Sequence, residues 1–294
     1  KRILKNYPLE KLIDTMDWSP FFRSWDLAGK YPDILADKVV GKQAKKLFQD
    51  ATKFLNEIVS KKSLTADAIF AIYPARKTSC EDITLFADES LKRKLFTWHG
   101  LRQQTKKPRE NKNKCLADYV SHINESKKDY LGAFFVTING TEKLSKKFEN
   151  MNDDYSAIMV KAISDRLVES FAEQLHKLVR TEFWGYSPNE NLTSNELISE
   201  AYQGIRPAPG YPACPDHSIK EQLAKTLNAK EIGISLTENL AMNPASSICG
   251  FYFWHPEASY FTIGSIGKDQ LEDYQKRQKL TEENAKKRLM TILS

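Results

Sequence analysis

A proline-rich segment from Ile205 to Pro215 carries the most distinctive chemistry in this sequence of 294 residues. Arg206 can bind a carboxylate through two parallel hydrogen bonds, and Tyr211 can stack on a flat ring while its hydroxyl stays in water. Gly210 permits close approach of a ligand, and both Ala208 and Gly210 keep the backbone amides that prolines lack. Because the prolines restrict the backbone in advance, little entropy remains to be lost on binding. The residues alone favour a binding loop no more than a rigid structural loop with Arg206 in an internal ion pair.

Two other clusters could complete such a site. Asp17 precedes a helix that Pro20 can start. A carboxylate there is favoured simply as an N-terminal cap, and the alternative is that it holds an ammonium or a ribose hydroxyl. Tyr260 and Phe261 open a predicted strand, and adjacent strand residues point to opposite faces. We therefore expect at most one of these two rings to face a ligand.

Several common classes of site are excluded by the absence of their motifs. The sequence has no Gly-x-Gly-x-x-Gly after a strand, no phosphate-binding P-loop and no Gly-x-Ser-x-Gly elbow. The five histidines and four cysteines lack zinc-ligand spacing, so we expect no metal site. Four scattered cysteines are typical of reduced thiols in a reducing compartment. No apolar run approaches the ~20 residues that span a bilayer.

The net charge of +6 is too small to indicate a nucleic-acid-binding protein. It is concentrated between Arg102 and Lys114, where six cations and one acid account for +5 of the total. Such charge runs are usually solvated faces. The alternative is a landing site for an acidic protein partner.

Periodicity predicts the elements that must position these residues. The first 60 residues are expected to be helical, with a long amphipathic helix over 40–61. Another long helix is predicted over 154–184, with a core-facing apolar stripe that includes Tyr155 and Ile158, and shorter helices over 270–279 and 282–293. Strands are predicted over 68–73 (ended by Pro74), 83–87, 95–98, 131–138, 248–254 and 260–266. The order lacks regular alternation of strands and helices, which favours an α+β fold over a Rossmann-type sheet.

Several segments together resemble one protein family. They are Asp17-Trp18 with Pro20-Phe21-Phe22, Asp153-Asp154-Tyr155 with Ile158 to Ala162, Arg166-Leu167, the Arg206-to-Pro215 segment, and Leu236-Thr237-Glu238. These are similar to the C-terminal activation domain of cobalamin-dependent methionine synthase. The resemblance covers nearly the whole chain. It implies a single α+β domain over residues 1–294, a fragment of a larger enzyme, built on a bent antiparallel sheet flanked by helices.

The resemblance also implies a function and a ligand. Such domains bind S-adenosylmethionine and present its methyl group for reductive methylation of oxidised cobalamin, which reactivates the methyltransferase. The residues that match the family's binding positions are Asp17, Glu169, Arg206, Ala208, Gly210, Tyr211, Tyr260 and Phe261. We expect Arg206 to hold the methionyl carboxylate, Asp17 and Glu169 to favour the ammonium or sulfonium side, and Tyr211 or Tyr260 to pack on the adenosine. No acid or base is expected, because the sulfonium already activates the methyl group.

The expected partners follow from the same resemblance. Cobalamin and zinc would be held only by other domains of the intact enzyme, whose cobalamin-binding domain would contact this chain. Flavodoxin or a related flavoprotein reductase would supply the electron. We expect a cytoplasmic protein that binds neither nucleic acid nor membranes and that, as a fragment, does not turn over homocysteine. The alternatives are a stand-alone reactivation protein for another corrinoid methyltransferase and a reductase-docking module that has lost its ligand.

Overall fold

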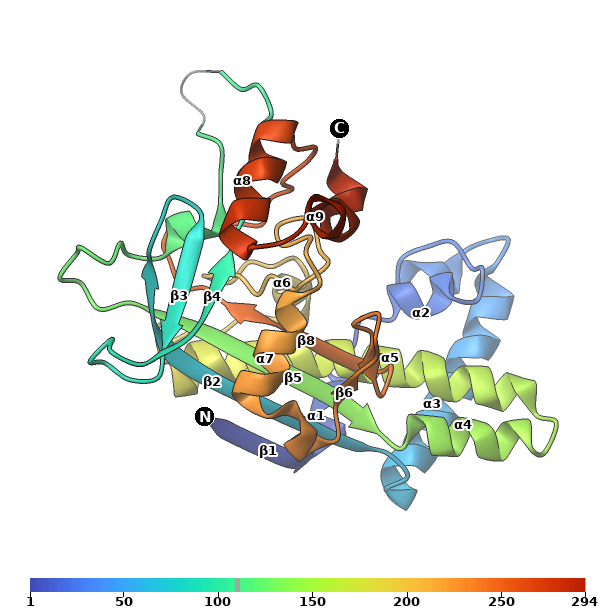
Figure 1. Cartoon of the computed structure of the whole chain (residues 1–294). Coiled ribbons are helices and arrows are strands. Elements are labelled where there is room, and N and C mark those ends of the chain that lie inside the picture. Colours follow the sequence, from blue (N-terminus) through green and yellow to red (C-terminus); the bar gives the residue numbers. More distant parts are fainter. Residues whose placement is uncertain (109–111, 294) are drawn as a thin grey trace.

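An antiparallel sheet forms the centre of the computed structural model, which describes residues 1–108 and 112–293. Its strands follow the order β4-β3-β2-β5-β8, and β1 also pairs with β2. Figure 1 shows β3 and β4 turning away from the long direction of β2 and β5, so the sheet is bent. The strands are β1 (Arg2–Tyr7), β2 (Thr65–Lys77), β3 (Asp82–Phe86), β4 (Lys94–His99), β5 (Tyr130–Asn139) and β8 (Ser247–Tyr252), with β6 (Ser235–Leu236) and β7 (Met242–Asn243) forming a separate pair.

Helices pack around this sheet, and the predicted long helices are confirmed. They are α1 (Glu10–Ile13), α2 (Ser19–Arg23), α3 (Gly41–Lys61), α4 (Thr141–Glu149), α5 (Asp154–Leu178), α6 (Ser194–Ile198), α7 (Ile219–Leu227), α8 (Lys268–Gln278) and α9 (Glu282–Leu289). A π-helical turn, Val179–Phe183, continues α5. Short 3-10 turns occur at Asp33–Ala36, Leu116–Tyr119, Ala229–Ile232 and Met290–Ile292.

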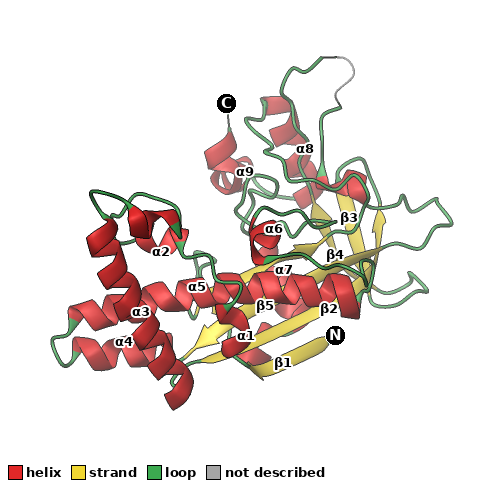
Figure 2. Cartoon of the chain, turned by 180° about the vertical axis from the view of Figure 1, so that it is seen from behind, coloured by secondary structure: helices red, strands yellow, loops and turns green. Residues whose placement is uncertain are grey.

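Both faces of the sheet are covered, and β5 shows how. Phe134 and Val136 belong to the core shared with α3 and α5, whereas Ala133 and Phe135 belong to the core on the α7 side. The opposite views of Figures 1 and 2 place α5 along one face and α7 on the other. A strand buried on both faces must be apolar throughout, which explains the continuous apolar run that marks β5 in the sequence.

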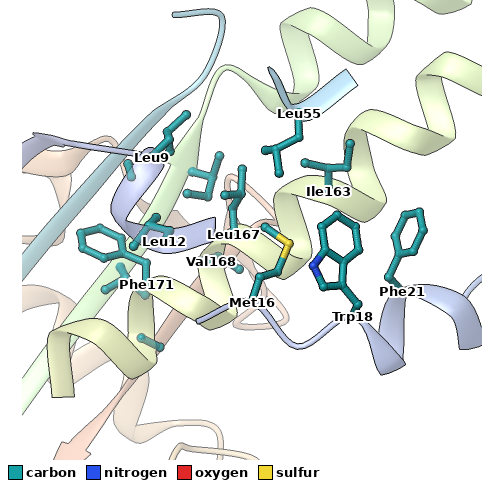
Figure 3. Packing of buried hydrophobic residues seen from close by; sticks show 14 of the residues in the cluster. Leu9, Leu12, Met16, Trp18, Phe21, Leu55, Ile163, Leu167, Val168 and Phe171 are labelled. Atoms are coloured by element: carbon teal, nitrogen blue, oxygen red, sulfur yellow. The ribbon is translucent and has the colours of Figure 1, made fainter. Parts of the chain in front are cut away.

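The long helix α5 begins at a side-chain cap and then lies against the sheet. The Asp153 carboxylate accepts a hydrogen bond of 3.0 Å from the Ser156 amide, which caps the helix. Further along, Leu167 and Phe171 pack with residues of the first two helices in the core (Figure 3). The predicted core-facing stripe of this helix is wrong at its first two residues, since Tyr155 and Ile158 are 44% and 50% exposed. They are exposed because the first turns of α5 pair with α4 beyond the sheet (Figure 1).

Three other predictions are wrong for identifiable reasons. The N-terminal segment forms the edge strand β1 instead of a helix, because it pairs with β2 from Arg2 opposite Phe70 onward. Pro74 does not end β2. The N–H of Ala75 donates towards β5, so the nitrogen of Pro74 faces the interval between β1 and β3, where no ladder bond is required. No strand forms over 260–266, which runs as an irregular segment with one isolated bridge at Ile266.

Candidate functional site

A cavity of about 600 Å³ lies between α5, the edge of the sheet and the proline-rich segment. This volume is in the range of pockets that hold small-molecule ligands. Six of the eight predicted site residues line it. The lining comprises Phe134, Glu169, Ala172, Glu200, Arg206, Pro207, Ala208, Tyr211, Pro212, Ala213, Ile248, Tyr260, Phe261 and Thr262. We call it the Arg206 cavity.

The proline-rich segment reaches this cavity by attaching to the free edge of β8. Ile205 exchanges two backbone hydrogen bonds with Phe253, of 3.1 and 2.9 Å, and the amide of Phe251 donates to the Pro207 carbonyl at 3.0 Å. Gly250 allows this close approach, because a Cβ there would lie 2.8 Å from that carbonyl oxygen. The prediction that the segment is not regular secondary structure is confirmed.

Tyr260 and Phe261 both line the cavity, although strand alternation predicted at most one ring facing it. Because no strand forms here, the two side chains are not forced to opposite faces. The amide of Ile263 donates to the Pro212 carbonyl at 2.9 Å, and the Tyr260 hydroxyl accepts from the Arg206 amide at 3.0 Å. These bonds fix the 260–263 segment against the proline-rich segment.

Arg206 is anchored on one side and open on the other. Its Nη1 donates to Oε2 of Glu173 at 2.6 Å and to the Tyr202 hydroxyl at 2.9 Å. Burial opposes the positive charge, but the ion pair with Glu173 outweighs it and raises the pKa of Arg206. Its Nε and Nη2 make no hydrogen bond to any residue within 1–108 or 112–293. The internal ion pair therefore coexists with a free guanidinium edge that can bind a carboxylate.

Two carboxylates share the cavity with Arg206. Burial raises the pKa of both Glu169 and Glu200, with Arg206 acting in the opposite direction on each. A cationic ligand group would stabilise their charged forms. Glu200 was missing from the predicted set because it belongs to no motif: it follows α6 in an irregular segment with a φ of 58°. The only sequence signal is an acid six residues before Arg206.

The remaining predicted residues occupy different positions. Ala208 lines the cavity wall, and Tyr211, which is 61% exposed, lies at its mouth. Gly210 lies outside the lining: its amide donates to the Cys214 carbonyl at 2.7 Å, and with a φ of 92° its missing Cβ leaves room for the His217 ring. Asp17 also lies outside the lining, and its Oδ1 accepts a hydrogen bond of 2.9 Å from the amide of Ser19, the first residue of α2. Ligand contacts by these two residues stay predictions.

A second cavity, of about 720 Å³, lies beside the basic segment, and we call it the basic cavity. Its lining is Lys77, Arg102, Lys107, Lys112, Asn113, Lys114, Cys115, Asp118, Tyr119 and Glu257. Arg102 forms ion pairs with Glu81 at 2.9 Å and Asp118 at 2.6 Å. Lys114 donates to the hydroxyl of Ser259, next to Tyr260, at 2.7 Å. Arg109 and Glu110, which also belong to the predicted basic segment, lie outside the described residues.

The geometry agrees with two comparisons to known proteins. A family model described as vitamin B12 dependent methionine synthase, activation domain, matches residues 8–279. The chain belongs to this family. It is also similar to a crystal structure of the MetH reactivation domain bound to AdoHcy, with 44% sequence identity and a TM-score of 0.95. That match covers 100% of this chain and 90% of the other, so the α+β fold with its open antiparallel sheet is the fold of this domain.

Three further observations concern the chemistry of this activation domain. No helix of the described residues is long and apolar enough to cross a membrane. Over the same residues, no three His, Cys, Asp or Glu side chains come together as metal ligands would. All four cysteines are free thiols, as the spacing predicted, with Cys80 exposed and the other three buried.

Proposed function

We propose that this activation domain binds S-adenosylmethionine in the Arg206 cavity and presents its methyl group to cobalamin held by a neighbouring domain of methionine synthase. The observation that carries this proposal is the meeting of a guanidinium edge, two carboxylates and four aromatic rings in one cavity. The similarity to a reactivation domain bound to AdoHcy supports it. When bound, S-adenosylmethionine supplies an activated methyl group, and the residues of this chain bind and orient it.

Each part of the ligand has a complementary group in the cavity. Arg206 takes the carboxylate through its Nε and Nη2 edge, as a planar fork matches a carboxylate. Glu169 and Glu200 favour the ammonium and sulfonium charges, and Tyr260, Phe261 and Tyr211 pack on the adenosine. Asp17 favours the same ammonium or sulfonium side from outside the lining through Oδ2, since only its Oδ1 accepts from the Ser19 amide.

The open mouth of the cavity suits a methyl donor. Tyr211 is 61% exposed, so a ligand packed against it remains accessible from outside the domain. A methyl acceptor carried by another domain must approach the sulfonium directly, which a closed cavity would prevent. The mouth therefore supports presentation of the ligand to a second domain, and not catalysis inside this one.

Calorimetric titration of the wild-type domain with S-adenosylmethionine and S-adenosylhomocysteine tests the binding proposal. We expect saturable binding of both ligands with one site per chain. At 100 times its dissociation constant, a ligand should stabilise the domain by about 2.7 kcal/mol, measured by unfolding with and without ligand. Arg102→Met, in the basic cavity, is the matched control and should bind both ligands as the wild type does. Absence of binding and of stabilisation at millimolar ligand would refute the proposal.

We further propose that a flavodoxin-like flavoprotein reductase docks at the basic cavity and that the protein works in the cytoplasm. Lys107, Lys112 and Lys114 form no ion pair with any described carboxylate, so their charges remain available to an acidic surface. The four free thiols support a reducing compartment.

A further inference from the structure

A buried series of alternating charges lies behind Arg206 and extends into the core. Glu173 accepts from Arg206 through Oε2 at 2.6 Å, and its Oε1 lies 3.9 Å from Nη1 of Arg180. Arg180 in turn donates to both carboxylate oxygens of Glu190, at 2.6 and 2.7 Å. Arg180 is fully buried, and the Glu190 and Glu173 side chains are only 6% and 10% exposed. Two cations and two anions thus balance before any ligand enters.

Aromatic side chains keep this series in place. The guanidinium of Arg180 lies 4.1 Å from the centre of the Tyr202 ring, whose hydroxyl accepts from Arg206. His176 stacks on Tyr252 with 5.0 Å between ring centres, and its Nδ1 lies 3.5 Å from Nη1 of Arg206. Burial, reinforced by the two arginines, lowers the pKa of His176 well below its ordinary value, so the ring is neutral and adds no repulsion.

One face of α5 and its continuation brings these groups together. Glu169, Glu173, His176 and Arg180 follow at spacings of three and four residues, which places them on the same side of a helix. Glu169 therefore reaches the cavity, while the next residues along the face reach the back of Arg206. The same helix supplies both a cavity carboxylate and the support for the cavity cation.

We propose that Glu173 is a positioning residue: held beside Arg180, it fixes the Nη1 side of Arg206 so that the Nε and Nη2 edge faces a ligand carboxylate. This inference rests on the proposed binding of S-adenosylmethionine. A bidentate bond requires the guanidinium plane to be aligned with the carboxylate, and an unsupported arginine side chain would have to be ordered on binding. Loss of Glu173 should therefore lower the affinity for ligands that carry the carboxylate and leave the affinity for ligands without it unchanged.

The test compares two ligands on the same variant. S-adenosylhomocysteine carries the amino-acid group, whereas 5′-methylthioadenosine keeps the adenosine and the thioether without it. In Glu173→Gln, calorimetry should show a loss of affinity of about tenfold or more for S-adenosylhomocysteine, the scale of a charged hydrogen bond. The affinity for 5′-methylthioadenosine should stay within about twofold of wild type, since the rest of the cavity is unchanged. Glu149→Gln, which removes an exposed ion pair with Lys161 of 3.0 Å, is the control and should change neither.

Two outcomes would overturn the inference: an equal loss for both ligands, which indicates a general structural role, or no loss for either. Failure of the wild type to bind S-adenosylhomocysteine would instead refute the proposed function, so the two failures are distinguishable. If Glu173→Gln does not fold, Tyr202→Phe serves in its place, because it removes the hydroxyl that accepts from Arg206 and keeps the ring. It should weaken S-adenosylhomocysteine alone, by about threefold, and an equal effect on both ligands would again overturn the inference.

Discussion

The two cavities of this domain use positive charge in opposite ways. In the Arg206 cavity, a single guanidinium is fixed from behind by Glu173 and Tyr202. In the basic cavity, Arg102 and Lys77 pair with acids, whereas Lys107, Lys112 and Lys114 carry their charge on flexible stems without an ion pair to a described carboxylate. A fixed planar fork recognises one carboxylate in a defined orientation, whereas mobile ammonium groups give an attraction that salt screens. The net positive charge of the basic segment therefore marks a surface that attracts acidic groups, whereas the buried ion pair behind Arg206 marks the site that recognises a specific ligand group.

The largest expected effect is on the stability of the domain, which should fall more when a cation behind the Arg206 cavity is removed than when one in the basic cavity is removed. Arg180→Met leaves Glu190 without a cation and Glu173 with Arg206 alone, so the free energy of unfolding should fall by about 3–5 kcal/mol. Arg102→Met should lower it by only about 1–2 kcal/mol, since its partners keep part of their hydration. Urea denaturation of both variants measures the difference. Equal losses in the free energy of unfolding would contradict the proposed difference in burial between the charges behind Arg206 and those of the basic cavity.

The next largest effect concerns ligand affinity. Arg206→Ala should weaken binding of S-adenosylhomocysteine by about 2 kcal/mol or more, because a charged hydrogen-bond pair is lost. Arg102→Met should leave the dissociation constant unchanged. Calorimetry on the two variants at the same pH and salt makes the comparison. Unchanged affinity in Arg206→Ala would show that Arg206 does not bind the ligand carboxylate.

A smaller effect should appear as the pH falls. Burial raises the pKa of Glu169 and Glu200, so these carboxylates take up protons at a higher pH than exposed glutamates do. The cationic ligand binds their charged forms, and its affinity should therefore be constant at neutral pH and fall as the solution becomes mildly acidic. Titrations across this range, repeated with Glu169→Gln and Glu200→Gln, measure the slope. Both variants should flatten it, and an unaltered slope would exclude these acids as the cause.

The smallest effect should depend on salt. Replacing Lys106, Lys107 and Lys112 by Glu should slow reductive reactivation of the intact enzyme by a flavodoxin-like reductase several-fold at low ionic strength. The difference should vanish at about 1 M salt, where screening acts over roughly 3 Å. Ligand affinity should not change, which calorimetry checks. If reactivation is equally fast at low salt, the basic segment serves only solubility.

The parts of the fold that the sequence predicts are those in which local pattern and final environment agree. The 41–61 helix has one buried face and one solvated face, and the 131–138 run is apolar because both its faces are buried. The sequence pattern does not reveal the edge strand β1, because its charged residues face water and its partner residues on β2 lie 59 to 68 residues away. A pattern within one segment carries no information about such a distant pairing.

The same distinction holds for the candidate site. One proline-rich segment holds Arg206, Ala208 and Tyr211, and its composition already indicates a loop with a restricted backbone. Glu200 and Glu173 have no such context, because each becomes relevant only when the fold brings it to Arg206 or to the cavity. Glu173 in particular was hidden in an amphipathic helix, where an acid is ordinarily a solvated residue.

The position of Glu173 between two arginines has a consequence for protein engineering. Changing Arg206 to accept a neutral ligand would leave the buried Glu173 carboxylate at the back of the cavity without its main cation. A change in ligand specificity would therefore also destabilise the core. A redesign must therefore exchange the pair together, for example Arg206→Met with Glu173→Gln, and natural drift at either position should be accompanied by change at the other.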